Sequence, residues 1–283
     1  MRNSINYFKT GVLFAGLSAL LIAIGYLVAG RSGAIIFFGI SLIMNLGSYW
    51  FSDKIALAMS NAQSLPEDQA PEIYEDVRDL TQKMNLPMPR IYVSSEMQPN
   101  AFATGRNKNH AAVCVTQGLL QVLDRDEIRG VLAHELSHVK NNDVLIGTIA
   151  AVFAGAISSI ANIALWFGGS SNERDNNPIG SILLIILAPI SATLLQLAIS
   201  RSREYAADAT GSEYTKKPQD LANALIKIEN VANDIPMNVS PSMSSLFIQN
   251  PLRSEGFTEL FSTHPNTANR VAKLMQLEQD IKN

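Results

Sequence analysis

Four long apolar runs without a charged side chain constrain the fold of this chain more than any other feature. The runs cover residues 11–30, 32–52, 144–172 and 176–200. Each is long enough to cross the hydrocarbon core of a bilayer, about 30 Å thick, because a spanning helix needs about 20 residues. We therefore predict four apolar helices. The last two contain interruptions such as Gly168 and Pro189, and long helices that enter the bilayer only in part are an alternative for them.

Two other interpretations of these runs stay open. A charge-free hairpin can also be buried in the core of a protein, and a first apolar run can be a cleaved signal peptide. The run at 11–30 is longer than a typical signal-peptide core, lacks a clear A-x-A cleavage site and is followed at once by a second run. We interpret it as a retained anchor.

Basic residues flank the apolar runs unevenly. Two passes between residues 144 and 200 would return the chain to the side of residues 53–143, and only Arg31 and Arg174 are basic in the two opposite turns. By the positive-inside rule, residues 53–143, residues 201–283 and both termini are predicted to lie in the cytoplasm. The basic residues near the runs on that side are Arg2, Lys9, Lys54, Lys140, Arg201 and Arg203.

Composition excludes other kinds of site. The formal net charge is −3, which argues against a nucleic-acid partner. The single cysteine, Cys114, excludes an internal disulfide framework and a thiolate-rich zinc site. Because Cys114 lies in the strand-like run AAVCVT, we expect it to be a small buried hydrophobic residue.

The sequence HELSH at residues 134–138 indicates a metal-dependent hydrolase. The chain contains only four histidines, so a chance H-E-x-x-H is rare. On a helix, His134 and His138 share one face and can present two imidazoles to one ion, while Glu135, about 100° round the helix, reaches a bound water. The alternative is a pair of hydrogen-bonded core histidines.

Start signals predict that the helix carrying this motif covers residues 125–140. Asp124 is a good N-cap, and Glu127 follows three residues later, as in a capping box. Charged residues flank the motif too densely for bilayer depth, so the site is predicted to lie beside the membrane rather than within it. These residues are Arg125, Asp126, Glu127, Arg129, Lys140 and Asp143.

A third metal ligand must come from elsewhere in the chain, because catalytic zinc usually keeps three protein ligands and one open position. The extended pattern with a third histidine fails, since Asn141 and Val144 occupy its Gly and His positions. The segment SREYAADAT, residues 202–210, offers Glu204 as the ligand and Asp208 on the same helical face as the acceptor of a histidine ring N–H. A solvated helix face is the alternative.

Short strands are predicted at residues 90–95, 100–105 and 111–116. We expect 100–105, NAFATG, to be the edge strand, along which an extended peptide substrate pairs next to Asn100, Ala101 and Phe102. An interior strand is the alternative.

Two histidines remain outside the HELSH motif. In STHPNTANR, residues 262–270, His264 and Arg270 can donate to the oxyanion of a hydrolytic transition state. An ordinary N-terminal turn of the last helix is the alternative. His110 lies in a polar turn and is expected to be exposed. The segment 233–262 is unusually long for a connection without secondary structure. Two interpretations stay open for it, a mobile lid over the cleft and disorder.

Together, these motifs resemble the HtpX family of bacterial membrane-bound zinc metalloproteases, which is similar to the CAAX prenyl endopeptidases of eukaryotic membranes. The resemblance covers nearly the full chain. It implies one Zn²⁺ per chain, and quality control of damaged or misassembled membrane proteins at the bacterial inner membrane. The residues it implies are the zinc ligands His134, His138 and Glu204, the general base Glu135, and the transition-state stabilisers His264 and Arg270.

The expected fold is a mainly α membrane protein with four apolar helices and an α+β gluzincin-like zinc metalloprotease domain with a small sheet. Its parts would be two transmembrane helices in 1–52, a catalytic segment in 53–143, two further membrane helices in 144–200, and a C-terminal segment in 201–283 with the third ligand. The expected function is cytoplasm-facing cleavage of protein substrates. Two alternatives are a zinc-stabilised membrane scaffold without proteolysis and a prenyl-peptide endopeptidase.

Overall fold

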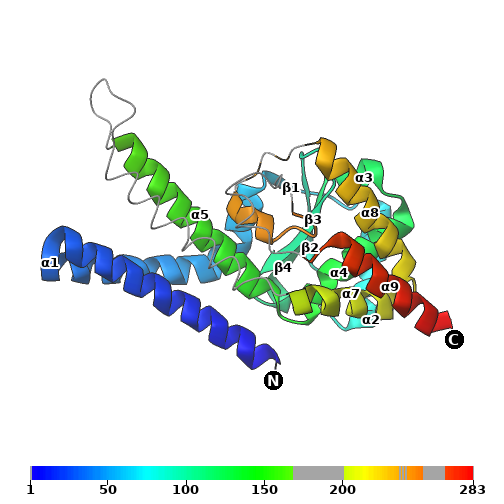
Figure 1. Ribbon diagram of the computed structural model, residues 1–283, viewed down its shortest axis with the longest axis horizontal. Coiled ribbons are helices and arrows are strands. Elements are labelled where there is room, and N and C mark those ends of the chain that lie inside the picture. Colours follow the sequence, from blue (N-terminus) through cyan, green and yellow to red (C-terminus); the bar gives the residue numbers. More distant parts are fainter. Residues whose placement is uncertain are drawn as a thin grey trace.

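The computed structural model describes residues 2–167, 201–235, 237, 239, 241–250 and 265–282. A small sheet surrounded by helices forms a body, from which two long helical arms extend (Figure 1). One arm is α1, the helical hairpin Arg2–Met59, and the other is α5, Val144–Phe167. The predicted fourth apolar run, 176–200, lies outside the described residues.

The first two apolar runs form the hairpin α1, which is bent at Ala29 and Gly30. Gly30 has φ +59°, a left-handed conformation that glycine adopts without steric cost. Within the described part of the chain, two helical segments are long and apolar enough to cross a membrane, Phe8–Tyr26 and Ala29–Met59, rather than the four predicted.

The third apolar run begins as a buried helix, which corrects the prediction of a membrane span for this part. The first half of α5 packs against the N-terminal arm of α1, where Leu145 and Ile149 cluster with Leu17. The rings of Phe14 and Phe153 meet edge to face, with centroids 5.6 Å apart. Because a charge-free run satisfies a protein core as well as a bilayer, its composition could not separate the two environments.

The sheet has four strands in the order β1-β2-β4-β3. Strands β2 and β4 pair in parallel, and the other two pairs are antiparallel. The strands are β1 (Ala62–Ser64), β2 (Arg90–Ser94), β3 (Ala101–Gly105) and β4 (Ala111–Thr116). Strand β3 lies at the edge, as the sequence predicts. The three-residue strand β1 was not predicted, because it is too short for an alternating pattern.

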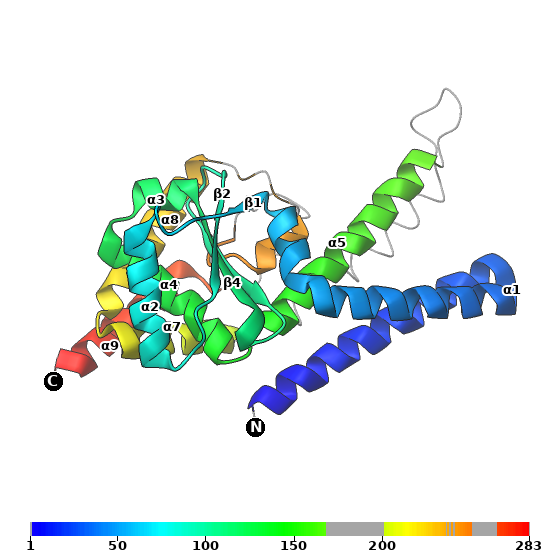
Figure 2. The same cartoon turned by 180° about the vertical axis from the view of Figure 1, so that it is seen from behind.

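Helices enclose the sheet and hold the motif-bearing helix α4 in the centre of the body (Figure 2). The capping box forms, with Asp124 and Glu127 exchanging two hydrogen bonds of 3.0 Å. Arg125 and Arg129 of α4 donate to Asp76 of α2, at 3.1 and 2.7 Å. The α-helices are α2 (Pro71–Met84), α3 (Gln117–Val122), α4 (Arg125–Lys140), α7 (Arg201–Thr215), α8 (Pro218–Asp234) and α9 (Thr267–Lys282), with 3₁₀-helices η1 (Lys108–His110) and η2 (Pro241–Ser245).

The single cysteine is buried in β4, as expected. Burial raises the pKa of the Cys114 thiol to about 12, which keeps it protonated at neutral pH. Because the thiolate is the form that reacts with maleimides and alkylating agents, this cysteine is expected to be inert in the folded protein.

Candidate metal centre

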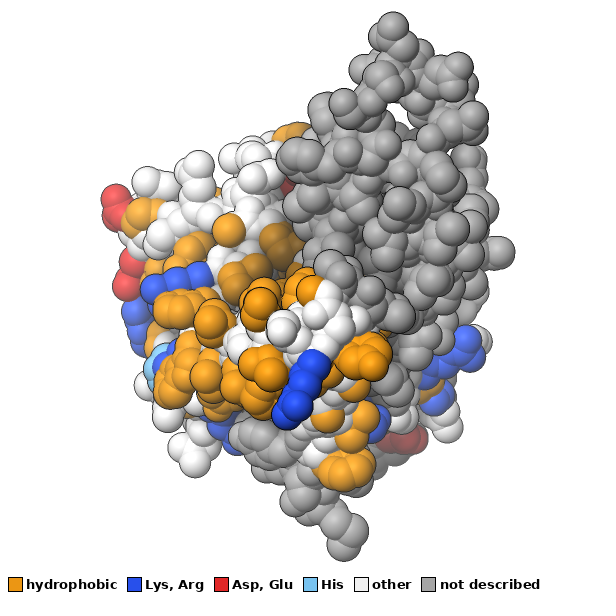
Figure 3. Space-filling model, turned by 90° about the vertical axis from the view of Figure 1, so that its left-hand side faces the viewer, with side chains coloured by type: hydrophobic (Ala, Val, Ile, Leu, Met, Phe, Trp, Pro, Cys, Tyr) orange, Lys and Arg blue, Asp and Glu red, His pale blue; other side chains and the backbone are white. Residues whose placement is uncertain are grey.

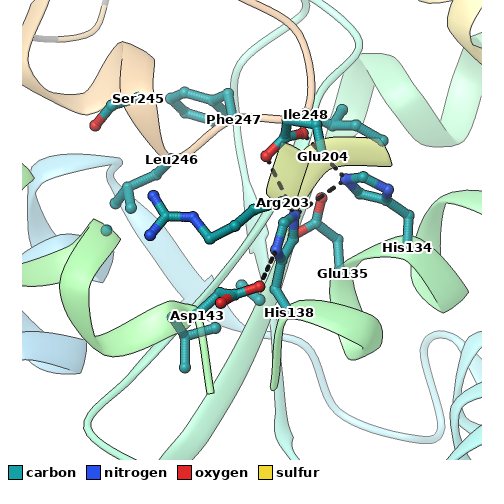
Figure 4. A pocket seen from close by; sticks show the side chains of 13 residues that line it. His134, Glu135, His138, Asp143, Arg203, Glu204, Ser245, Leu246, Phe247 and Ile248 are labelled. Atoms are coloured by element: carbon teal, nitrogen blue, oxygen red, sulfur yellow. Dashed lines mark hydrogen bonds and ion pairs between the residues drawn. The ribbon is translucent and has the colours of Figure 1, made fainter. Parts of the chain in front are cut away.

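Helix α4 presents His134, Glu135 and His138 of the HELSH motif to a cleft, at the point where α7 crosses α4. His134 and Glu135 are buried, and His138 is half-buried at the mouth of the cleft. Figure 4 shows the imidazoles of His134 and His138 and the carboxylate of Glu204, from α7, converging on one region. Burial of so many polar groups in one place is costly unless they pair with one another or hold a cation.

Three candidate ligand atoms converge closely enough to fit one metal ion. The Glu204 carboxylate oxygens lie 3.6 Å from Nε2 of His134 and 3.6 Å from Nε2 of His138. The two histidine Nε2 atoms are 3.2 Å apart. Tetrahedral zinc with bonds of about 2.0 Å separates its ligand atoms by roughly 3.3 Å, so the spacing of this group fits such an ion.

Each imidazole has a carboxylate beside its other ring nitrogen. Asp208 Oδ1 lies 2.9 Å from Nδ1 of His134, and Asp143 Oδ2 lies 3.6 Å from Nδ1 of His138. A carboxylate that is hydrogen-bonded in this position, as Asp208 is, fixes the tautomer and orientation of a metal-binding histidine, whereas Asp143 lies just beyond hydrogen-bond distance. The sequence predicts this role for Asp208 but not for Asp143. The signal that was missed is its position just beyond the end of α4, five residues after His138.

Arg270 of α9 is buried behind Asp208, with 1% of its surface exposed. Its Nε and Nη2 donate to the two carboxylate oxygens of Asp208, at 2.9 and 2.7 Å. Nη1 donates to the carbonyl of Ile248 at 3.0 Å. These contacts place Arg270 where it can hold Asp208, and through it His134, whereas the sequence predicts a donor to the oxyanion.

Neighbouring charges and hydrogen bonds shift the pKa values of Asp208 and His134 in the centre. Burial alone would raise the pKa of Asp208, but the Arg270 charge and hydrogen bonds from His134 and Arg270 lower it to about 2. Burial alone would lower the pKa of His134, but hydrogen bonds with Asp208 and Glu204 raise it to about 9. The carboxylates therefore favour positive charge on this imidazole, and a metal ion competes with the proton for the same nitrogen.

Glu135 lies beside the ligand group, with its carboxylate in a buried position. Burial raises the pKa of Glu135, and the neighbouring Glu204 raises it further. The two histidines and a hydrogen bond from the backbone N–H of Ala103 partly offset these effects. Because Ala103 belongs to β3, this contact links Glu135 directly to the edge strand.

The cleft holds about 50 Å³ and lies between α4, α7, β3 and the segment that follows η2. In Figure 4, Ser245, Leu246, Phe247 and Ile248 stand opposite the motif residues. These four residues belong to the stretch 233–262, for which the sequence left a lid or disorder open. Its described residues 241–250 include one wall of the cleft, and residues 251–262 lie outside the described residues.

Along β3, the backbone groups of successive residues point alternately inward, towards β4, and outward, away from the sheet. The Asn100 carbonyl points inward and accepts from Thr116, whereas the Ala101 carbonyl points outward and accepts from Ile248, at 3.0 and 2.9 Å. Strand periodicity then turns Ala103 outward as well and Phe102 inward. Ala103 was not predicted as a site residue, although the two-residue alternation from Ala101 was the signal for it.

The remaining predicted site residues have structural contacts or lie elsewhere. The Asn100 side chain donates to the Gln249 carbonyl at 2.9 Å, and the ring of Phe102 packs against that of Phe247, with centroids 5.2 Å apart. His110 is exposed, as expected, and contacts Asn107. His264 lies outside the described residues.

Gly211 permits the close crossing that brings Glu204 to the two histidines. A Cβ atom at Gly211 would lie 3.1 Å from the backbone nitrogen of His134 and 3.2 Å from the backbone carbon of Ala133. We expect Gly211→Val to separate α7 from α4, lower the unfolding free energy by about 1–3 kcal/mol and weaken metal binding, because helix backbones cannot yield as side-chain ends do. Metal titration and thermal unfolding test this. The matched control is Gly47→Val, at a half-buried helical position where a Cβ meets nothing within 4 Å. Equal metal affinity in both variants would contradict the expectation.

Comparison with known proteins identifies similar chains. Residues 67–278 match the peptidase family M48. Three curated relatives, each named "Protease HtpX homolog", come from Pelotomaculum thermopropionicum, Pyrococcus furiosus and Burkholderia thailandensis. The Pelotomaculum protein is 52% identical over 95% of this chain and 98% of its own. The Pyrococcus protein is 51% identical over 96% of each chain, and the Burkholderia protein is 51% identical over 96% of this chain and 97% of its own. The crystal structure of S. mikatae Ste24p has a similar fold, with a TM-score of 0.50 at 21% identity. That likeness covers 96% of this chain, which spans 65% of the Ste24p chain.

Proposed function

Because this chain belongs to peptidase family M48 and is an HtpX-type metallopeptidase, we propose that it is a membrane-bound zinc endopeptidase. Its proposed substrates are damaged or misfolded membrane proteins, which it cuts on the cytoplasmic side of a bacterial inner membrane. The observation that carries the chemical part is the convergence of His134, His138 and Glu204 beside the buried carboxylate of Glu135. Imidazole and carboxylate donors at this spacing suit one Zn²⁺ ion.

The proposed mechanism divides the work between the ion and the protein. Zinc, when bound, acidifies a water molecule and polarises the scissile carbonyl. Glu135 accepts the proton of the attacking water and delivers it to the leaving amine nitrogen. The N–H of Ala103 holds the Glu135 carboxylate towards β3, and Asp208 and Asp143 orient the two histidines. His264 is the proposed oxyanion donor, as the sequence suggests.

The proposed substrate is an extended segment of an unfolded or misassembled protein that lies along β3. Ala101 and Ala103 carry the outward-facing backbone groups, but the Ala101 carbonyl already accepts from Ile248 and the Ala103 N–H donates to Glu135. The proposed pairing therefore uses the Ala103 carbonyl and requires the substrate to displace Ile248 if it extends to Ala101. Asn100 and Phe102 support the strand through Gln249 and Phe247. Main-chain pairing of this kind is independent of substrate side chains, which suits an enzyme that meets many unfolded sequences.

Proteolysis by the detergent-solubilised full chain tests the catalytic part of this proposal. We expect cleavage of an unfolded protein substrate, loss of cleavage on chelation, and recovery when zinc returns at about one ion per chain. Cleavage restricted to prenylated peptides would favour the prenyl-peptide alternative. Bound zinc without cleavage of any substrate would favour the scaffold, although the described ligand group has three members and a closed structural site usually has four.

Membrane orientation gives a separate prediction. Arg31 lies in the turn of α1, and Lys282 lies at the end of α9; both are exposed. Cys114 is buried with a raised pKa, so single cysteines can be introduced without removing it. In intact cells, an impermeant maleimide is expected to label Arg31→Cys but to label Lys282→Cys only after the membrane is opened. Labelling of Lys282→Cys in intact cells would contradict a cytoplasmic catalytic domain.

A further inference from the structure

A second hollow lies where the hairpin α1 enters the body, and it shares no lining residue with the catalytic cleft. It is an open depression of about 530 Å³, a volume within the range of small-ligand sites. Two aromatic and two charged side chains of α1 form one wall, and polar and basic side chains of the sheet and its turns form the other. The lining residues are Trp50, Phe51, Asp53, Lys54, Arg90, Arg106, Asn109 and His110.

The position of this hollow along α1 matches one bilayer thickness. Trp50 follows the bend at Gly30 by 20 residues, which is about 30 Å at 1.5 Å per residue and equals the thickness of a hydrocarbon core. Seen from the hairpin end, hydrophobic side chains dominate the described surface, and apart from one basic side chain near its middle the charged and His side chains lie towards its edges (Figure 3). Ile43 and Leu46 are exposed on the way to the hollow, as are Trp50 and Phe51 at its entrance.

The aromatic residues at this level hold basic side chains in place. The Arg106 guanidinium lies 4.7 Å from the centroid of the Trp50 ring, and its Nη1 donates to the Trp50 carbonyl at 3.0 Å. The Lys54 ammonium lies 5.6 Å from the centroid of the Phe51 ring. Tryptophan and basic residues at one depth are typical of the interface between hydrocarbon and headgroups.

The charge of the hollow favours an anion. Among its lining residues, Asp53 is the acidic one, and it is paired with Arg90. Lys54 of α1 and Arg106 of the β3–β4 connection therefore remain as two further cationic side chains. The amide of Asn109 and the ring of His110 are hydrogen-bonding groups on the same wall as Arg106. A phosphodiester with an apolar tail fits this arrangement, because its phosphate meets the cations and its acyl chains follow the apolar face of α1.

We propose that this hollow binds the headgroup of an anionic phospholipid from the cytoplasmic leaflet and thereby fixes the depth of the catalytic body at the membrane. The inference rests on the membrane insertion in the proposed function, but it uses none of the catalytic residues. Arg106 precedes η1 on the turn between β3 and β4, so the bound headgroup also connects α1 to the edge strand of the sheet.

Native mass spectrometry of the full chain tests the proposal. The protein is offered phosphatidylglycerol and phosphatidylcholine at equal concentration in detergent, and the bound lipids are counted. Wild type is expected to retain phosphatidylglycerol preferentially. Each of Lys54→Gln and Arg106→Gln should reduce that preference about fivefold, which is the effect of one basic residue near an anionic surface. Arg106→Lys should restore part of it, because the charge returns without the planar guanidinium.

Matched controls separate charge in the hollow from charge in general and from loss of structure. Arg78→Gln removes an exposed arginine of α2 that pairs with Glu67, and it should leave lipid retention at the wild-type level. Thermal unfolding in detergent checks the fold of each variant. If Arg106→Gln proves unstable, the comparison of wild type with Lys54→Gln decides the question.

Four outcomes would overturn the proposal. Equal retention of the two lipids by wild type, or an undiminished preference in the double variant of Lys54→Gln and Arg106→Gln, would contradict an anionic lipid site. Displacement of the lipid by excess inorganic phosphate would assign the hollow to a free phosphate instead. Extraction of the wild-type chain from membranes by alkaline carbonate would refute membrane insertion as well, whereas retention in the membrane without lipid preference would refute this inference alone.

Discussion

Glu135→Gln is expected to lower kcat by about 10²–10⁴-fold while the protein still binds its metal ion. The substitution keeps the size of the side chain and a carbonyl oxygen that can accept from Ala103, but it removes the group that takes the proton of the attacking water. The ligand atoms belong to His134, His138 and Glu204, so metal affinity should change little.

Peptide hydrolysis, together with metal content measured on the same samples, checks this prediction. Glu72→Gln is the matched control, since Glu72 is exposed on α2 and should tolerate the change with wild-type kcat. If Glu135→Gln cut its substrate as fast as wild type, the general base would be misassigned and the zinc-stabilised scaffold would become the better interpretation.

Arg270→Met is expected to lower the unfolding free energy by about 3–5 kcal/mol and metal affinity by about 10–100-fold. The substitution leaves Asp208 buried without the guanidinium that neutralises it, and loss of one partner of a buried ion pair costs energies of this size. Asp208 would then orient His134 less well, which weakens the metal site. For a domain of this size, the unfolding midpoint should fall by about 10 °C.

Arg270→Lys distinguishes the two roles considered for this residue. Lysine keeps the positive charge but not the two parallel hydrogen bonds to Asp208. A positioning role predicts weaker metal binding, with kcat recovering when zinc is in excess. Unchanged metal affinity with kcat lowered about 10²–10³-fold would instead identify Arg270 as the oxyanion donor that the sequence suggests.

Several parts of the structure were predictable from the sequence because they depend on neighbours in the chain. The capping box at Asp124, the helix over 125–140 and three of the four strands all follow from short-range patterns of capping and periodicity. The family resemblance added the ligand set, whose three members the fold brings together.

Other features were decided only in three dimensions. The run at 144–172 reads as a membrane span, yet the first half of α5 is buried, because burial depends on which apolar surface meets it. Asp143 lies in the site because it follows the end of α4, and Ala103 because it belongs to the edge strand β3. A sequence gives the chemistry of Arg270 and Asp208 separately, but their contact spans 62 positions and exists because α9 packs beside α7. Hydrogen bonds and ion pairs act over a few ångströms, so only the tertiary packing determines which distant residues come within reach.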